Sequence, residues 1–253
     1  MTLITRRNLV GSLGVTAGGL LLSGCDRIAA APKVQQVLSL GEGLTIRAQR
    51  LVSDRTALAR EFSASDMSPF FRTNGNTMPG SDEYATHVTN GFADWRLKVD
   101  GLVRRPQAFS LAQIKAMSAR TQITRHDCVE GWSAIGKWTG LPLKLALDAA
   151  GVLPSARYVV FHCADDSDGT PYYESIDLVD AYHPQTILAW GMNDQLLSVG
   201  HGAPLRLRVE RQLGYKQAKY VMRVQAVDSL QGIAAGKGGY WEDVSNYQWY
   251  AGI

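Results

Sequence analysis

The chain has 253 residues, 45% of them hydrophobic and 9% aromatic, and a formal net charge of +3 at pH 7. This content is enough to bury the core of one domain of about 200 residues. Lysine and arginine are scattered among aspartate and glutamate, so no basic stripe indicates nucleic-acid binding. Three cysteines cannot form a disulfide framework, which excludes the small disulfide-stabilised class.

Residues 1–25 have the pattern of an export signal. Two arginines at positions 6 and 7 precede an apolar, glycine-broken run, 9–22, which is too short to span a bilayer. The arginine pair resembles a twin-arginine signal, and Leu22-Ser23-Gly24-Cys25 resembles a bacterial lipobox. We therefore predict export as a folded protein, lipidation of Cys25 and a periplasmic location at the inner membrane. The alternative is an ordinary secretory signal with an unrelated cysteine.

Residues 26–62 are predicted to be a tether and an N-terminal extension, and residues 63–253 the functional domain. Within the extension, 44–51 has the character of a strand and 55–62 that of one or two helical turns. Serine, proline, glycine and asparagine dominate 63–91, yet Phe70 and Phe71 argue against disorder. We expect this long loop to be ordered and to lie over a pocket.

The rest of the chain predicts more strands than helices. Ser110 is placed to cap a helix that begins at Leu111, and a second helix runs from Pro142 to Ala150 and ends at Gly151. Asn193-Asp194 predicts a turn, and the aromatic stretch 236–253 a tail packed on the domain. A short helix is expected at 177–182, and strands at 95–100, 121–126, 158–163, 186–190, 205–209 and 219–224. The predicted class is α+β, with mixed sheets and short helices.

Cys128 is the first candidate for chemistry. It ends a predicted strand, and His126, Asp127 and Glu130 lie next to it in the sequence. A structural cysteine normally has apolar neighbours, whereas charged neighbours indicate a site where the thiolate form matters. The alternative is a core cysteine at a strand end.

Other chemistries fit these residues less well. His126, Cys128, His162 and Cys163 are zinc ligand types, but adjacent residues on a strand point to opposite faces, so the four cannot easily converge. The acidic turn 164–169 lacks the ligand order of a calcium loop and is expected to be solvated. A cysteine hydrolase is possible in principle, although no hydrolase signature surrounds Cys128.

A basic cluster near the C-terminus predicts an anion site. Lys216 and Lys219 follow a flexible Gly214, and Arg206 and Arg208 stand a few residues earlier. Such groups can bind a phosphate together. The alternative is a solvated basic edge strand.

Four segments together resemble one family. They are CVEGW at 128–132, KWTGLPL at 137–143, TILAWGMND at 186–194 and HGAPLRLRVERQLGYKQAKYVMRV at 201–224. This order is similar to the molybdopterin-dependent oxidoreductases of the sulfite oxidase fold. The likeness is strongest to their bacterial periplasmic branch, which includes the catalytic subunits of protein-methionine-sulfoxide reductases. The resemblance covers about 68–228.

The resemblance implies roles for eight residues and one cofactor, a mononuclear molybdenum-molybdopterin without a nucleotide. Cys128 matches the cysteine that ligates molybdenum and is therefore also the expected catalytic residue. The reductase branch has Thr at the position of Cys163, so a packed core thiol remains the alternative for this residue. At the position of His201, the reductase branch often has Asn. The implied cofactor-binding residues are Asn74, Cys163, His201, Arg206, Gln217, Ala218 and Lys219, of which the last three match the phosphate cradle.

The departures from the family narrow the expected function. Animal sulfite oxidases carry basic residues just after the metal cysteine, whereas this chain has Glu130-Gly131-Trp132. We therefore expect oxygen-atom transfer, with reduction of a small or protein-bound S-oxide or N-oxide favoured over sulfite oxidation. No haem motif and no immunoglobulin-like dimerisation domain is recognised, so a monomer with a separate membrane or periplasmic haem partner is expected. The alternatives are a sulfite-oxidising enzyme and a noncatalytic lipoprotein that binds without reacting.

Overall fold

The structure is a computed structural model that describes residues 31–52, 54–167 and 169–253. The predicted signal and Cys25 lie outside these residues. One compact unit comprises Asp54–Ile253, and the part of the chain before it contains the helix α2, Pro32–Val52. The strand expected at 44–51 was wrong, since these residues are helical; Leu44, Ala48 and Leu51 follow helical spacing. No helix within the described residues is long and apolar enough to cross a membrane.

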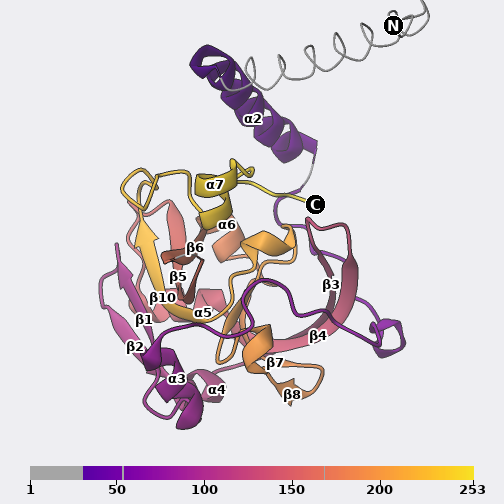
Figure 1. Cartoon of the computed structure of the whole chain (residues 1–253), viewed down its shortest axis with the longest axis vertical. Helices are drawn as coiled ribbons and strands as arrows, with labels where there is room; N and C mark the ends of the chain where they lie inside the picture. Colours follow the sequence, from indigo (N-terminus) through magenta and orange to yellow (C-terminus); the bar gives the residue numbers. More distant parts are fainter. Residues whose placement is uncertain (1–30, 53, 168) are drawn as a thin grey trace, which may run out of the picture. The chain divides into compact units, whose positions relative to one another are not determined.

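The first sheet has five strands in the order β2-β1-β10-β5-β6 (Figure 1). β1 and β10 run parallel, and the other neighbours run antiparallel. β2 and β6 had not been predicted. The bounds are Arg96–Gly101 for β1, Gln107–Ser110 for β2, Tyr158–Ser167 for β5, Thr170–Asp177 for β6 and Val221–Val227 for β10.

The second sheet is antiparallel, in the order β3-β4-β7-β8, with β9 paired to β7. Asn193 and Asp194 both have positive φ in the tight turn between β7 and β8, which confirms the predicted turn. The strand β4 was also not predicted. The bounds are Arg120–Asp127 for β3, Ser133–Pro142 for β4, Ile187–Met192 for β7, Gln195–Leu196 for β8 and Arg206–Arg208 for β9.

Short helices connect and cover the sheets, so the predicted α+β class is confirmed. The Ser110 side chain accepts a bond from the Gln113 amide at 3.1 Å, and Gly151 ends its helix at φ +70°, as predicted. The α-helices of this unit are α3 Asp82–Thr89, α4 Leu111–Ala116, α5 Leu143–Ala150, α6 Leu178–Ala181 and α7 Tyr240–Ser245. The 3-10 helices are η1 Ala64–Asp66, η2 Val199–His201 and η3 Gly214–Lys216.

The main core contains side chains from both sheets and from α5. Trp95, Leu141, Phe161 and Leu207 are fully buried in it. A smaller cluster gathers around Phe71 and Trp138, close to the end of β3. Two packed cores on either side of β9 thus fix the positions of the loops that end β3 and follow β9.

Residues 54–57 form a turn and 58–62 have no helical structure, so the helical turns expected at 55–62 were wrong. The side-chain amide of Gln185 bonds both backbone groups of Ala59, at 2.7 and 3.0 Å, and the Phe62 amide donates to Ile123 O at 2.9 Å. These bonds satisfy the backbone in the way that a neighbouring strand would.

Candidate functional site

A cavity of about 330 Å³ lies at the end of β3. Its walls come from the loop 71–76, the β5–β6 hairpin, the segments 200–206 and 214–219, and the C-terminal residues 240–247. The structure thus brings together segments that are far apart in the sequence. Seven of the eight predicted site residues line this cavity: Asn74, Cys128, His201, Arg206, Gln217, Ala218 and Lys219.

Cys128 lies on the wall directly after β3. Its side chain is 7% exposed, and Asn74 Nδ2 donates to its Sγ at 3.1 Å. Burial raises the pKa of the Cys128 thiol, so the protein alone favours the neutral form. Alternation along β3 puts His126 on the same buried side, whereas Arg125 and Asp127 point away and bond each other at 2.9 Å. Of the charged neighbours in the sequence, Arg125 and Asp127 therefore lie away from the sulfur, whereas Glu130 lines the same cavity.

The loop 71–76 is fastened over the cavity, as expected. Lys219 Nζ donates to the carbonyl oxygens of Asn74 at 2.7 Å and Gly200 at 3.0 Å, and also to that of Asn76. His201 Nε2 lies 3.3 Å from Phe71 O, and Ser198 Oγ lies 2.9 Å from its Nδ1. A lysine ammonium and an imidazole thus position the loop that carries Asn74.

Two cations of the predicted anion cluster face the cavity. Burial, followed by the charge of Arg208, lowers the pKa of Arg206 to about 9. Burial, followed by the charge of Arg206, lowers the pKa of Lys219 to about 8. Within the described part of the chain, Arg206 Nε has no hydrogen-bond partner. Buried, crowded positive charges with an unused donor are the arrangement that an anionic ligand stabilises.

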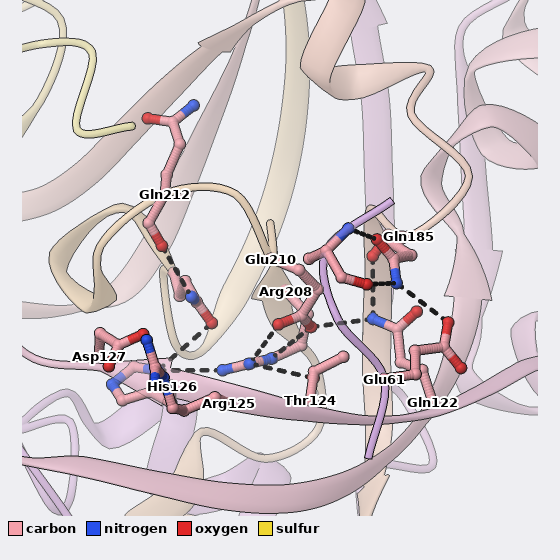
Figure 2. A network of polar contacts seen from close by, with 12 residues as sticks. Glu61, Gln122, Thr124, Arg125, His126, Asp127, Gln185, Arg208, Glu210 and Gln212 are labelled. Atoms are coloured by element: carbon pink, nitrogen blue, oxygen red, sulfur yellow. Dashed lines mark hydrogen bonds and ion pairs between the residues drawn. The ribbon is translucent and has the colours of Figure 1, made fainter. Parts of the chain in front are cut away.

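The other two cations of that cluster are structural. Arg208 is fully buried, bonds both oxygens of Glu210 at 3.0 and 2.6 Å, and lies 3.0 Å from His126 Nδ1 (Figure 2). Because a guanidinium only donates, His126 Nδ1 accepts and its proton sits on Nε2. Lys216 is also fully buried, between Glu174 at 2.6 Å and Glu242. Arg208 and Lys216 therefore do not bind the anion predicted for them.

Cys163 is the predicted site residue that the structure does not place on the cavity wall. Its side chain packs against the main core, and burial raises its pKa well above the ordinary value. The geometry thus favours the alternative of a packed thiol. Asp165, two residues later, does line the cavity and is 5% exposed, whereas Asp166 and Gly169 of the same acidic turn are exposed, as expected. Burial raises the pKa of Asp165 to about 6.

Sequence reasoning missed four aromatic residues of the site. Tyr215 belongs to the GYKQAK segment, and three others lie in the aromatic C-terminal stretch that had been taken for packing alone. The aromatic composition of this stretch was the only signal for them, and composition does not indicate which side chains face a cavity. The four residues are Tyr215, Tyr240, Trp241 and Tyr247, and Tyr172 lines the cavity beside them.

A protein-built metal cluster is absent from the residues that the structure describes: no three His, Cys, Asp or Glu side chains converge there. A single cysteine sulfur beside an amide is suited to a metal that takes most of its ligands from a cofactor. Soft thiolate is a favoured ligand for such metals, and coordination keeps it deprotonated.

The residues present therefore fit a molybdopterin. Arg206 and Lys219 supply positive charge for a phosphate, and the orphaned Arg206 Nε supplies a donor. Cys128 supplies a sulfur that faces the same cavity. The cavity also meets the usual size of a cofactor site.

Comparison with known proteins agrees with this fit. The family described as "Oxidoreductase molybdopterin binding domain" matches residues 85–232. A putative protein-methionine-sulfoxide reductase subunit YedZ1 from Azospira oryzae is 38% identical over 94% of this chain and 84% of its own length. The catalytic subunit MsrP from Xanthomonas campestris is 33% identical over 63% of this chain and 52% of its own. MsrP from Xanthomonas axonopodis is 28% identical over 98% of this chain and 76% of its own.

Among solved structures, the sulfane dehydrogenase SoxCD from Paracoccus pantotrophus is similar, with a TM-score of 0.50 and 24% identity. The likeness covers 54% of this chain and 39% of that one, and it confirms the predicted sulfite oxidase-type fold. The family match spans more than half of the 253 residues, and the relative from Azospira oryzae extends the likeness over nearly all of them. The chain is therefore an enzyme of the molybdopterin-binding oxidoreductase family.

Proposed function

We propose that this chain holds a mononuclear molybdenum-molybdopterin and reduces S-oxides, with electrons from a separate redox partner. The observation that carries the proposal is that the Cys128 sulfur and the Arg206 and Lys219 cations line one cavity. Relatives named as methionine-sulfoxide reductases, at 38% and 33% identity, support the substrate class. When bound, the molybdenum centre supplies oxygen-atom transfer coupled to two electrons.

The residues of this chain bind and orient the cofactor. Cys128 would ligate the metal, and the Asn74 amide, 3.1 Å from its sulfur, would hold the thiolate in place. Arg206 would donate to the phosphate through its unpaired Nε, and Lys219, whose Nζ donates to three loop carbonyls, would add positive charge beside Gln217 and Ala218. His201 would act through the 71–76 loop, because its ring bonds Phe71 O rather than pointing free into the cavity.

The rim beside Cys128 favours an uncharged oxide over an oxyanion. Arg72 and Glu130 both line the cavity there and both act on the Cys128 thiol, with opposite charges. One positive and one negative group do not make the basic cluster that sulfite would need. Sulfite oxidation remains the second candidate of the same fold, since Arg72 alone can attract an anion.

The partner and the location are part of the proposal. The relatives are named as subunits, which supports a separate redox partner. We infer a membrane or periplasmic haem protein in that role. We further infer a periplasmic monomer anchored at the inner membrane through Cys25; this rests on the twin-arginine and lipobox motifs alone.

Metal and pterin analysis tests the proposal. Protein from a molybdenum-replete host is expected to contain one molybdenum and one pterin per chain and to reduce methionine sulfoxide with a reduced dye. Cys128→Ala should abolish turnover and remove the thiolate signal from the molybdenum spectrum. Lys115→Ala, an exposed change on α4, is the control. A folded protein free of metal and pterin would instead support a binding module, and hydrolytic turnover that needs no metal and is lost on thiol alkylation would support a cysteine hydrolase.

A further inference from the structure

The helix α2 has a continuous apolar strip, here named the leucine face: Leu40, Leu44, Ala48 and Leu51. An α-helix turns by about 100° per residue, so these four positions fall within an arc of roughly 80°. The three leucine side chains are 68%, 65% and 87% exposed, in chain order. Large apolar side chains that gather on one side of a helix and stay exposed indicate a surface that binds something apolar.

The rest of the helix circumference is mostly polar. Arg47 borders the leucine face, and Thr45 and Gln49 lie farther around, beside half-buried Ile46. The helix contains three basic residues and one acidic residue, and both Arg47 and Lys33 of the first turn are exposed. An amphipathic helix of this composition binds in the plane of a membrane interface. Its apolar side then faces the acyl chains, and its basic groups lie among the headgroups.

The position of α2 in the chain also favours a lipid surface. In the location proposed above, Cys25 is held at the inner membrane, and only residues 26–31 separate it from Pro32, a span of at most about 25 Å. A lipid on Cys25 would therefore keep α2 at a high local concentration relative to the bilayer. The compact unit begins at Asp54, so α2 is the described element nearest to that anchor in the sequence.

The charges of α2 favour anionic lipid over a second copy of the helix. Arg47 borders the leucine face, so two copies packed through this face would place like charges at the edge of an apolar contact. Anionic headgroups instead have the sign that complements Arg47 and Lys33, and each basic residue near such a surface adds to the attraction. The aliphatic stems of both side chains also allow their charged ends to reach the headgroup layer.

We propose that the leucine face of α2 lies in the headgroup layer of an anionic phospholipid bilayer, with Arg47 and Lys33 against lipid phosphates. This contact is a second, noncovalent attachment to the membrane, in addition to the proposed lipid on Cys25. It goes beyond the S-oxide reductase activity and does not depend on it. The compact unit, which follows α2 directly in the chain, is thereby kept near the membrane.

The test measures partition onto lipid vesicles for a chain that begins at residue 25 and carries Cys25→Ser, so that no lipid is attached. Vesicles of phosphatidylcholine alone are compared with vesicles of equal parts phosphatidylcholine and phosphatidylglycerol. The wild-type chain is expected to bind the mixed vesicles and to be released as salt rises. Leu40→Ala, Leu44→Ala and Leu51→Ala together should lower the partition coefficient at least about tenfold, with helix content unchanged because alanine favours helices. Arg47→Gln alone should lower partition onto the mixed vesicles about fivefold and leave the neutral ones unaffected.

Three exposed apolar side chains of the compact unit give a matched control. Leu58, Leu196 and Val244 are 59%, 68% and 53% exposed, and their joint replacement by alanine removes a similar apolar area. This control variant should bind both kinds of vesicle as the wild type does. Reduction of methionine sulfoxide by every variant should stay at the wild-type rate, so failure of the membrane contact and failure of the proposed function are seen in separate measurements.

Four results would overturn the membrane contact. The first is a wild-type chain that binds neither kind of vesicle, and the second is equal partition of the wild type and the triple leucine variant. The third is equal binding to neutral and mixed vesicles, which would remove the role of the anionic headgroups. The fourth is a dimer that depends on the leucines and forms without vesicle binding, which would assign the leucine face to a second copy of this chain.

Discussion

The Asp165 carboxylate lies in a buried environment that disfavours its negative charge. It is 5% exposed on the cavity wall, and its Oδ1 has no hydrogen-bond partner among the described residues. Burial raises its pKa to about 6, from an ordinary value near 3.8. The Asp165 carboxyl thus binds its proton more tightly in the folded protein than in the unfolded chain. Its contribution to the free energy of unfolding is therefore greatest below pH 4 and falls as the pH rises to 6.

Asp165→Asn should therefore stabilise the cofactor-free protein at pH 7, by up to about 3 kcal/mol. The fall in the free energy of unfolding between pH 4 and pH 6 should become shallower at the same time. Urea unfolding of wild type and variant at several pH values measures both effects. Asp166→Asn, at the exposed neighbouring position, should change neither. An unchanged pH profile in Asp165→Asn would show that the carboxyl has another partner.

At the scale of elements, Gly140 allows β4 and β7 to approach. A Cβ added at this position would lie 2.5 Å from Ala189 Cα and would also clash with Leu188 O. Both are backbone atoms, so the strands would have to separate. Gly136, in the same strand, leaves room for the Phe71 ring, with 3.2 Å to a Cβ position. Glycines that look like loop residues in the sequence thus belong to a packed strand.

Gly140→Ala should lower the free energy of unfolding by roughly 1–3 kcal/mol, because overpacking forces backbone shifts. Denaturant unfolding measures the loss. Gly80→Ala is the control, since nothing lies within 4 Å of a Cβ there and φ is not positive. Equal stability of the two variants would mean that β4 is not paired as described.

The Lys216 cluster joins three elements: β6, η3 and α7. Glu174 and Glu242 share one lysine, and burial raises the pKa of Glu174 well above its ordinary value. The cluster therefore holds one carboxyl more than the single lysine can neutralise. Such a group stabilises a fold only while its central cation is present.

Lys216→Met should lower the free energy of unfolding by about 3–5 kcal/mol, because it leaves two buried carboxyl groups without a cation. Glu242→Gln should cost far less, since it removes the surplus negative charge and keeps the shape. Thermal or urea unfolding compares the two with Lys115→Met, a change at an exposed lysine of α4. A larger loss in Glu242→Gln than in Lys216→Met would contradict this account.

At the scale of the whole molecule, the segment 54–62, predicted to end the N-terminal extension, makes polar contacts with the residues that follow it. The compact unit starts at Asp54, and Arg55 pairs with Asp177 at 2.5 Å. Gln185 is fully buried and bonds the backbone of Ala59. The division between tether and domain at 62 stays a prediction that truncation can test.

A chain that begins at residue 54 should unfold with the same free energy as the full protein. A chain that begins at 63 should lose roughly 2–4 kcal/mol, because the buried Gln185 amide is left without its partners. Urea unfolding of both truncated proteins measures the difference. Equal stability of the two would place the boundary at 62, as the sequence suggested.

Much of the fold followed from local pattern. Alternation predicted β1, β9 and β10, β-like apolar runs predicted β3, β5 and β7, and capping residues predicted α4 and α5. β4 was missed because its glycines are typical of a loop. α2 was missed because its short apolar runs are also typical of a strand. β6 and α3 were missed because they lie in stretches rich in turn-forming residues.

The sequence by itself determined the family, the fold class and seven residues on the cavity wall, because the motifs that carry them are short and local. Only the tertiary structure decided which cations face the cavity. Arg206 and Lys219 do, whereas Arg208 and Lys216 are neutralised by carboxylates elsewhere in the structure. It also decided that the C-terminal aromatic residues form a wall of the site. Charge pairing and burial depend on groups distant in the chain, and no local pattern encodes their distance.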